Sequence, residues 1–142
     1  MVFTCPKTVR PVLGFFVFLA LIDGALRFDL LSLPHTVCNT GIALGIRLPD
    51  SFLWLSTALF LCIALYQAYR RHEGVEQLAW MAVFTGGAIN AIDRGLHGCV
   101  TDYLHLPFFP SFNLADIMLS LGVMVLLVVM LGIMPNVKTY VR

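Results

Sequence analysis

Charged side chains divide the chain into long apolar stretches. The stretches fall at residues 11–26, 51–69, 77–93 and 115–137. About 20 apolar residues in a helix cross the hydrocarbon core of a bilayer, whereas a strand of a membrane barrel needs only about 9–11. The pattern therefore predicts an all-α membrane protein with four transmembrane helices, organised as a single domain over residues 1–142.

Two turn-rich segments separate these helices on one side of the predicted membrane. They are residues 27–50 and 94–111, and we expect the first to hold a small β-like element at the interface. Most of the acidic residues lie at this outer face: Asp23, Asp29, Asp50, Asp93, Asp102 and Asp116. Carboxylates near hydrocarbon are costly unless they are paired, hydrated or used. We therefore expect the chemistry of the protein in these two loops.

Composition supports the membrane prediction and excludes two other classes. The chain is 59% hydrophobic and 12% charged, with nine Lys and Arg against eight Asp and Glu. An ordinary soluble domain is about 45–50% apolar and about 25% charged. The near balance of charge provides no field to attract nucleic acid, so no nucleic-acid partner is expected. High hydrophobicity with low net charge also excludes disorder.

The first apolar stretch is predicted to be a retained helix. Lys7 and Arg10 precede it as they would precede a secretory signal, but the residues after Ile22 offer no small-x-small cleavage site. Basic residues then set the orientation, because cytoplasmic loops carry more of them. Most of them fall on the side of both termini, which we expect to be cytoplasmic: Lys7, Arg10, Arg70, Arg71, Lys138 and Arg142, against Arg27, Arg47 and Arg94 on the other side.

The four cysteines form no recognisable metal or redox motif. Cys5, Cys38, Cys62 and Cys99 are scattered and include no CxxC pair. Cys38 and Cys99 both fall on the outer side, where a disulfide is an alternative. Because nothing in the sequence fixes their separation, we expect free thiols.

Polar residues at two predicted helix ends are candidates for a site. Asn113 and Asp116 have the spacing of a helix cap just before the last apolar run, which a purely structural role also explains. Asn90 and Asp93 lie three residues apart and share one side of the third helix. Asp93 has two possible partners, Asn90 on the same helix side and Arg94 next to it in sequence, and both would keep its carboxylate ionised. We therefore expect Asp93 to stabilise the site rather than to carry protons.

Two carboxylates without a neighbouring nucleophile are typical of water activation. A pair sharing one proton can act as a base on water and as an acid on a carbonyl oxygen, and it needs no metal or cofactor. The sequence contains no HExxH, no GxSxG and no phosphate-binding loop. His97 and His105 leave a metal site open as a weaker alternative, because their spacing matches no common ligand pattern.

Three motifs then resemble lipoprotein signal peptidase, signal peptidase II. They are NxxDR at residues 90–94, GxVxD followed by an aromatic at 98–103, and FPxFNxAD at 109–116. Residues 39–45 are similar to the N-x-G-x-A-x-G stretch of that family, and Asp23 lies where the family has an aspartate. The resemblance covers nearly the whole chain.

The resemblance implies a membrane aspartyl endopeptidase of the bacterial inner membrane, with its active site at the outer face. Such an enzyme removes signal peptides from diacylglyceryl-modified prolipoproteins by cutting before the lipidated cysteine, and globomycin-type inhibitors and membrane lipid are expected partners. By position, Asp102 and Asp116 correspond to the catalytic pair. Supporting positions are Asn90, Asp93, Arg94, Asn113, Asp23 and Asn39. Gly41 and Gly45 lie in a loop that we expect to cover the substrate; the alternative is that these glycines only allow the chain to turn.

The sequence departs from the family pattern at four points. Arg27 stands where Lys is usual, Gly24 replaces a polar neighbour of Asp23, and Ile89 stands where Gly is usual. The stretch from Asp102 to Asp116 is shorter than is typical, so we expect a reduced cover over the site.

Two rival functions remain. A small ion- or proton-coupled membrane transporter would use the same carboxylates as a relay, but it would need ionisable groups near the middle of the membrane. The second and fourth predicted helices have none between their ends. An inactive scaffold would require loss of Asp102 or Asp116, and both are present.

Overall fold

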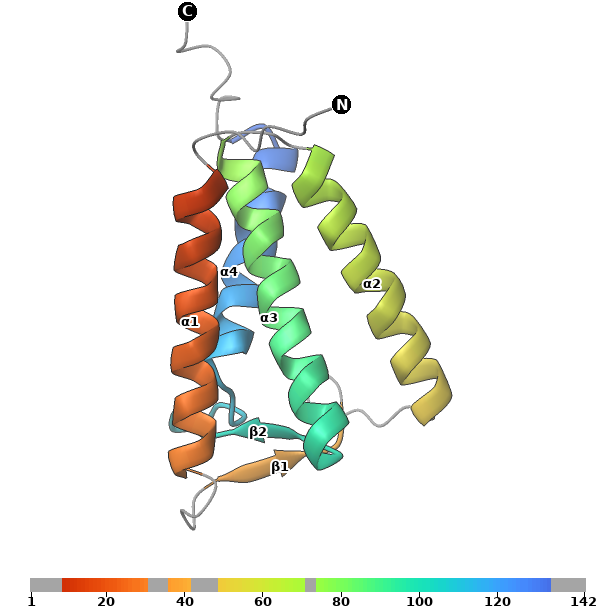
Figure 1. The fold of residues 1–142 in the computed structure, drawn as a ribbon, viewed down its shortest axis with the longest axis vertical. Coiled ribbons are helices and arrows are strands. Elements are labelled where there is room, and N and C mark those ends of the chain that lie inside the picture. The colour runs from red at the N-terminus through yellow and green to blue at the C-terminus, as the bar shows by residue number, and fades with distance from the viewer. Residues whose placement is uncertain (1–8, 31–35, 42–48, 71–73, 134–142) are drawn as a thin grey trace, which may run out of the picture.

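The computed structural model describes residues 9–30, 36–41, 49–70 and 74–133, which form four helices and a two-stranded sheet. The helices are α1 (Val9–Leu30), α2 (Asp50–Arg70), α3 (Val75–His97) and α4 (Leu114–Met130). They run side by side, and the sheet crosses one end of the bundle (Figure 1). Each helix overlaps one predicted apolar stretch, so the prediction of four helices is confirmed for the described residues.

The helix bounds differ from the apolar stretches mainly at the C-terminal ends of α1, α3 and α4, and α1 continues past residue 26 to Leu30. α3 continues past residue 93 to His97, which adds a further turn carrying Arg94, and Gly98 then ends the helix with a left-handed φ of 75°. α4 ends at Met130 rather than at residue 137, because Gly132 adopts a φ of 69° and the Ile133 N–H donates to the carbonyl of Val128. The last four residues of that predicted stretch lie outside the described residues.

Outward-facing positions on the helices are largely apolar. On α2, Leu55 is 70% exposed, and its neighbours of the same kind include Phe52, Leu59 and Tyr69. Among the described residues α2 is also long and apolar enough to cross a bilayer, with a mean hydropathy of 1.6, and α4 is a shorter apolar helix. Helices that are apolar all round are stable only in apolar surroundings.

α3 forms the centre of the bundle and packs most extensively on α4. The two helices approach closely where Gly86 and Gly122 remove the side chain from the interface, and both glycines are buried. Ile89, at a position where the resemblance noted above implies Gly, instead packs on a small cluster containing Phe16 and Met118. The close approach is therefore kept one turn earlier in α3.

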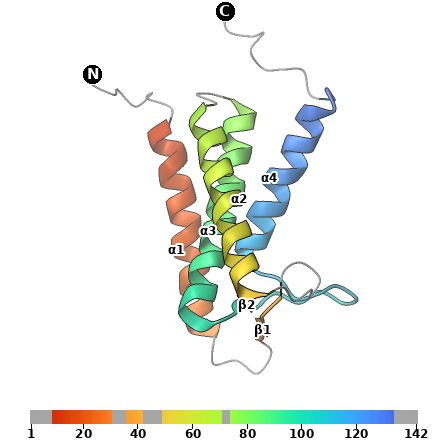
Figure 2. The same cartoon turned by 90° about the vertical axis from the view of Figure 1, so that its right-hand side faces the viewer.

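A short antiparallel sheet corrects the expectation of an all-α protein. β1 (Val37–Asn39) pairs with β2 (Val100–Asp102) in the register Val37 to Asp102 and Asn39 to Val100. β1 is the β-like element expected in the first loop, but its partner in the second loop was not predicted. The pairing joins the two outer loops across the end of α3 (Figures 1 and 2).

The expectation of free thiols at Cys38 and Cys99 is wrong. The two residues form a disulfide with their Cα atoms 5.5 Å apart, although 61 positions separate them in sequence. The sheet explains the proximity, because Cys38 lies opposite Thr101 and Cys99 directly precedes β2. Without the strand pairing, nothing in the sequence indicates that the two cysteines lie close together.

The segment between Asp102 and Asp116 folds into a hairpin that projects from the bundle (Figure 2). The N–H of Leu104 donates to the carbonyl of Phe112 at 2.8 Å, and the N–H of Phe112 donates back at 3.0 Å. The rings of Phe109 and Phe112 meet edge to face, with centroids 5.8 Å apart. This hairpin returns the chain to the start of α4.

Candidate active site

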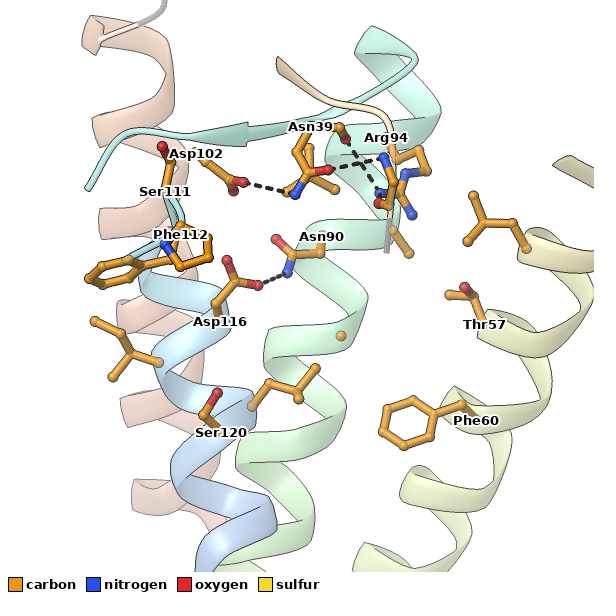
Figure 3. A pocket seen from close by; sticks show the side chains of 18 of the residues that line it. Asn39, Thr57, Phe60, Asn90, Arg94, Asp102, Ser111, Phe112, Asp116 and Ser120 are labelled. Carbon is orange, nitrogen blue, oxygen red and sulfur yellow. Dashed lines mark hydrogen bonds between the residues drawn. The ribbon is translucent and has the colours of Figure 1, made fainter. Parts of the chain in front are cut away.

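Asp102 and Asp116 face the same cavity from two different elements (Figure 3). Asp102 is the last residue of β2, and Asp116 lies in the first turn of α4. The cavity has a volume of about 720 Å³, and side chains from α2, including Thr57 and Phe60, line its opposite wall. The sequence-predicted pair is thus brought together at one end of a cavity whose other walls are mainly, though not wholly, apolar.

The start of α4 has the capping arrangement that its sequence predicts. Asn113 Oδ1 accepts the backbone N–H of Asp116 at 2.9 Å, and Asp116 Oδ2 accepts the backbone N–H of Asn113 at 3.1 Å. The two side chains therefore satisfy two backbone donors reciprocally. The same contacts fix Asp116 at the mouth of the cavity, so the structural and functional explanations of these residues coexist.

Two asparagine side chains hold Asp102. Asn113 Nδ2 donates to Asp102 Oδ1 at 2.8 Å, and Asn39 Nδ2 of β1 donates to Asp102 Oδ2 at 3.1 Å. Asp102 is 2% exposed and Asn113 is fully buried. The strand pairing that brings β1 to β2 is what places Asn39 within reach of Asp102.

Asp116 receives its second donor from α3. Asn90 Nδ2 donates to Asp116 Oδ1 at 2.7 Å, and the Asn113 N–H occupies Oδ2 (Figure 3). All four carboxylate oxygens of Asp102 and Asp116 therefore accept an N–H donor from a neutral group. Neutral donors fix the geometry of the carboxylates without neutralising them with a full positive charge.

Burial raises the pKa of Asp102 above its ordinary value, and the negative charge of Asp116 acts in the same direction. The hydrogen bonds from Asn39 and Asn113 oppose this shift in the pKa of Asp102. The two carboxyl groups therefore interact, and interacting carboxyl groups titrate as a pair rather than singly. The pair can then supply a base and an acid to the same reacting group.

Asp93 has different partners from those that we expected. Its Oδ2 pairs with the guanidinium of Arg27 on α1 and accepts the backbone N–H of Thr101 at 2.6 Å. Its Oδ1 lies 2.8 Å from His97 Nδ1. Arg94 does not pair with Asp93, since its Nη2 donates to the backbone carbonyls of Gly41 at 2.5 Å and Asn39 at 3.5 Å. Asp93 is buried and paired, as expected, but through α1.

Arg27 and Tyr103 also belong to the site, although the sequence patterns did not predict a role for either residue there. Both contact Asp23, which is fully buried: Arg27 through an ion pair, and the Tyr103 hydroxyl by donating to Oδ1 at 2.8 Å. The N–H of Ala115 also donates to that oxygen at 3.3 Å. The spacing of four residues between Asp23 and Arg27 on a helix is the signal that could have identified the pair.

Gly41 lies beside the cavity, while Gly45 is outside the described residues. The N–H of Gly41 donates to Asn39 Oδ1 at 3.0 Å, which turns the Asn39 amide so that its NH₂ group faces Asp102. Of the residues 39–45 that we expect to cover the substrate, the structure describes residues 39–41, so for the others the expectation stays a prediction.

Within the described residues no three His, Cys, Asp or Glu side chains come together as a metal site. His97 is bonded to Asp93, and His105 is exposed in the hairpin after β2. In the described part of the chain, the groups that donate hydrogen bonds to Asp102 and Asp116 are side-chain and backbone amides.

The fold and site thus define a helical protein of membrane type, with one buried and one half-buried carboxylate facing a cavity in an apolar four-helix bundle. A family model described as signal peptidase (SPase) II matches residues 15–132. The chain therefore belongs to the signal peptidase II family.

Several curated relatives are named lipoprotein signal peptidase. The chain is 36% identical over 98 residues to the lipoprotein signal peptidase of Syntrophomonas wolfei, covering 67% of this chain and 65% of the relative. It is 37% identical over 95 residues to that of a Synechocystis species, covering 64% and 59%. It is also 37% identical over 100 residues to the lipoprotein signal peptidase of Streptococcus pneumoniae, covering 66% of this chain and 64% of the relative. The chain thus spans less than two thirds of the length of these relatives.

Solved structures agree on the fold. A bacterial membrane enzyme determined by the in meso method at 2.3 Å resolution has a TM-score of 0.78 and 24% identity, with 94% of each chain covered. A second such structure, at 1.9 Å resolution, has a TM-score of 0.71 and 24% identity, covering 87% of this chain and 94% of the other. The four-helix arrangement is therefore that of known bacterial membrane enzymes.

Proposed function

We propose that this chain is an aspartic endopeptidase that removes the signal peptide from diacylglyceryl-modified prolipoproteins, cutting before the lipidated cysteine. One observation carries the proposal: Asp102 and Asp116 face one cavity, with all four carboxylate oxygens oriented by neutral donors. Family membership supplies the substrate class, because the curated relatives are named lipoprotein signal peptidases.

The reaction begins with a water molecule between the two carboxyl groups. The ionised aspartate takes a proton from the water as its oxygen attacks the scissile carbonyl carbon, and the protonated aspartate gives its proton to the carbonyl oxygen. The tetrahedral diol then collapses as its C–N bond breaks. The leaving nitrogen, which becomes the amino terminus at the lipidated cysteine, receives the proton that the first aspartate took from water. One hydroxyl of the diol returns its proton to the other aspartate, so the pair again holds one proton. No metal or cofactor enters these steps.

The supporting residues divide into two groups by their contacts. Asn39, Asn90 and Asn113 touch the carboxyl groups of the pair and orient them. Asp23 and Asp93 meet at Arg27 behind the pair, while Arg94 fixes the backbone of Gly41 beside the cavity. In this proposal Gly41 and Gly45 belong to a loop that lies over the bound peptide.

The cavity suits a peptide whose lipid chains stay in the membrane. Its wall on α2 includes Trp54 and Phe60, and its hairpin side includes Phe109 and Phe112, whereas polar groups concentrate at the Asp102 end. In this arrangement the scissile bond enters between the helix ends and the acyl chains lie against the exposed apolar surface of the bundle. Globomycin-type inhibitors would occupy the same cavity.

The proposed setting is the bacterial inner membrane. Residues 11–26, 51–69, 77–93 and 115–137 would be the spans, with both termini in the cytoplasm and Asp102 at the outer face. Two of the basic residues on the outer side support this orientation, because Arg27 and Arg94 are committed to contacts within the site. Their charges are therefore part of the site rather than a feature of an exposed loop.

A transporter relay is the rival that the structure disfavours. A relay needs ionisable groups along the middle of the bundle. In α2 the side chains that are charged at neutral pH occur only at the ends, Asp50 and Arg70, and α4 carries only Asp116, in its first turn.

The test is cleavage of a purified lipidated prolipoprotein by the purified protein in detergent or vesicles. We expect a size shift of the precursor that globomycin abolishes, and no shift of the same precursor left without its diacylglyceryl group. The unlipidated precursor is the matched control for non-specific proteolysis. Absence of any shift of the lipidated precursor by folded protein would contradict the proposed function.

A further inference from the structure

Arg27 contacts polar groups on three elements with a single guanidinium. It is 5% exposed, and its Nε and Nη1 pair with Asp23 of α1 and Asp93 of α3. Nη1 also donates to the carbonyl of Thr101 in β2 at 3.2 Å. The remaining nitrogen, Nη2, donates to Asn90 Oδ1 at 2.9 Å. Arg27 therefore reaches one residue that itself touches the carboxylate pair.

The contact with Arg27 decides which way the Asn90 amide points. A guanidinium has only donors, so the amide oxygen of Asn90 must face it and the NH₂ group must face away. That NH₂ group donates to Asp116 Oδ1 at 2.7 Å. A flipped amide would place NH₂ against the guanidinium and oxygen against the carboxylate, which loses both hydrogen bonds.

In the described part of the chain, Asn90 differs from the other two asparagines that donate to the pair. Asn39 is oriented by the backbone N–H of Gly41, and Asn113 by the backbone N–H of Asp116. Asn90 is oriented by a side chain. Its orientation is therefore open to change by substitution at a position that does not touch Asp102 or Asp116.

Lysine at position 27 could not make the same set of contacts. An ammonium group offers three donors from one nitrogen, whereas the guanidinium here serves four acceptors through three nitrogens in a fixed plane. Asn90 Oδ1 is the one of these four acceptors that Nη2 serves, and an ammonium nitrogen held between the two carboxylates has no counterpart to Nη2, so the contact with Asn90 is the one that a lysine loses.

We propose that Arg27 is a positioning residue, which acts on the reaction by holding the Asn90 amide in the orientation that donates to Asp116. The kinetic consequence rests on the proposed peptidase function. The orientation itself is a property of the folded protein and can be measured without a substrate.

The kinetic test is a double-mutant cycle of Arg27→Lys with Asn90→Ala. We expect Arg27→Lys to lower kcat by about 100-fold, as small displacements of catalytic groups do, with KM changed by less than about threefold. In the Asn90→Ala background, Arg27→Lys should have no further effect on kcat. Asn39→Ala is the matched control, because Asn39 touches Asp102 but not Arg27, and its effect should multiply with that of Arg27→Lys. Multiplicative loss with Asn90→Ala would overturn the proposal.

The second test is nitrogen-15 NMR of protein labelled at asparagine, with the Asn90 side-chain signals assigned by their absence in Asn90→Ala. We expect these amide protons to exchange with water at least about tenfold more slowly than free asparagine in the wild type and in Asn39→Ala. The protection should be lost in Arg27→Lys. Rapid exchange of the Asn90 amide protons in the wild type would overturn the proposal, and this measurement does not depend on the folding of any variant. Slow exchange that persists in Arg27→Lys would also overturn it. If the wild type cleaves no lipidated precursor yet shows this pattern, the proposed function fails and the role of Arg27 in orienting Asn90 stands.

Discussion

Gly86 of α3 and Ala115 of α4 approach so closely that a Cβ atom on Gly86 would lie 2.4 Å from the Ala115 carbonyl oxygen. Asn90 lies one helical turn after Gly86, and Asp116 directly follows Ala115. The separation of the two backbones at this point therefore sets the Asn90 to Asp116 hydrogen bond. The packing of α3 on α4 and the geometry of the site therefore both require that position 86 has no side chain.

Gly86→Ala should destabilise the protein by about 1–3 kcal/mol, because the new methyl group meets backbone atoms that cannot rotate away. kcat should fall as well, since α4 must move away from Asn90. Thermal unfolding in detergent and turnover per folded molecule measure the two effects. Gly24→Ala is the control, because no atom lies within 4 Å of the added methyl group, and it should leave stability unchanged or raise it by about 0.5–1 kcal/mol. Equal effects of the two substitutions would contradict this account.

The Cys38–Cys99 disulfide should contribute to stability and not to the reaction. Cys99→Ser should lower the free energy of unfolding by about 2–4 kcal/mol, because the bridge closes a long loop in the unfolded chain. Turnover below the unfolding temperature should stay within about threefold of the wild type, since neither cysteine lines the cavity that Asp102 and Asp116 face.

The control for this prediction is Cys62→Ser, which changes the exposed free cysteine of α2 and should shift stability by no more than about 0.5 kcal/mol. Loss of processing in a folded Cys99→Ser protein would show that the bridge or a thiol takes part in the reaction, and would require a revised mechanism.

The raised pKa of Asp102 predicts a pH dependence of stability. A carboxyl group whose pKa is higher in the folded than in the unfolded state binds more protons when folded, so its stabilising contribution is complete at low pH and is lost as pH rises through the folded-state pKa. Asparagine cannot ionise. The unfolding temperature of Asp102→Asn relative to the wild type should therefore rise between pH 4 and pH 7. A relative unfolding temperature that falls over this range would mean that the pKa of Asp102 is lowered in the folded protein.

Local patterns predicted the parts of this molecule that local physics determines. The apolar stretches predicted the positions of all four described helices, and the Asn113 to Asp116 spacing predicted a cap that the structure contains in full. The ends of α3 and α4 were less predictable, because glycines at 98 and 132 set them within sequences that are otherwise helical or apolar.

The long-range contacts could not be obtained in the same way. The pairing of β1 with β2 joins segments more than 60 positions apart, and both the disulfide and the Asn39 to Asp102 contact depend on it. Asp93 was assigned to its neighbour in sequence, Arg94, whereas Arg27 reaches it across the bundle from α1. Arg27 stood out only as a departure from the family pattern, and its contacts emerged only from the packing of α1 on α3.

The central claim, that Asp102 and Asp116 perform the chemistry while Asp93 braces the site, is tested most directly by one comparison. It measures cleavage of a lipidated prolipoprotein per folded molecule for the wild type, Asp102→Asn, Asp116→Asn and Asp93→Asn. The account predicts no detectable cleavage by folded Asp102→Asn or Asp116→Asn. Asp93→Asn, which breaks the buried pair with Arg27, should lose about 3 kcal/mol of stability while its folded fraction still cleaves. Near-normal turnover by Asp102→Asn, together with a folded but inactive Asp93→Asn, would contradict the account and reassign the pair to Asp93 and Asp116.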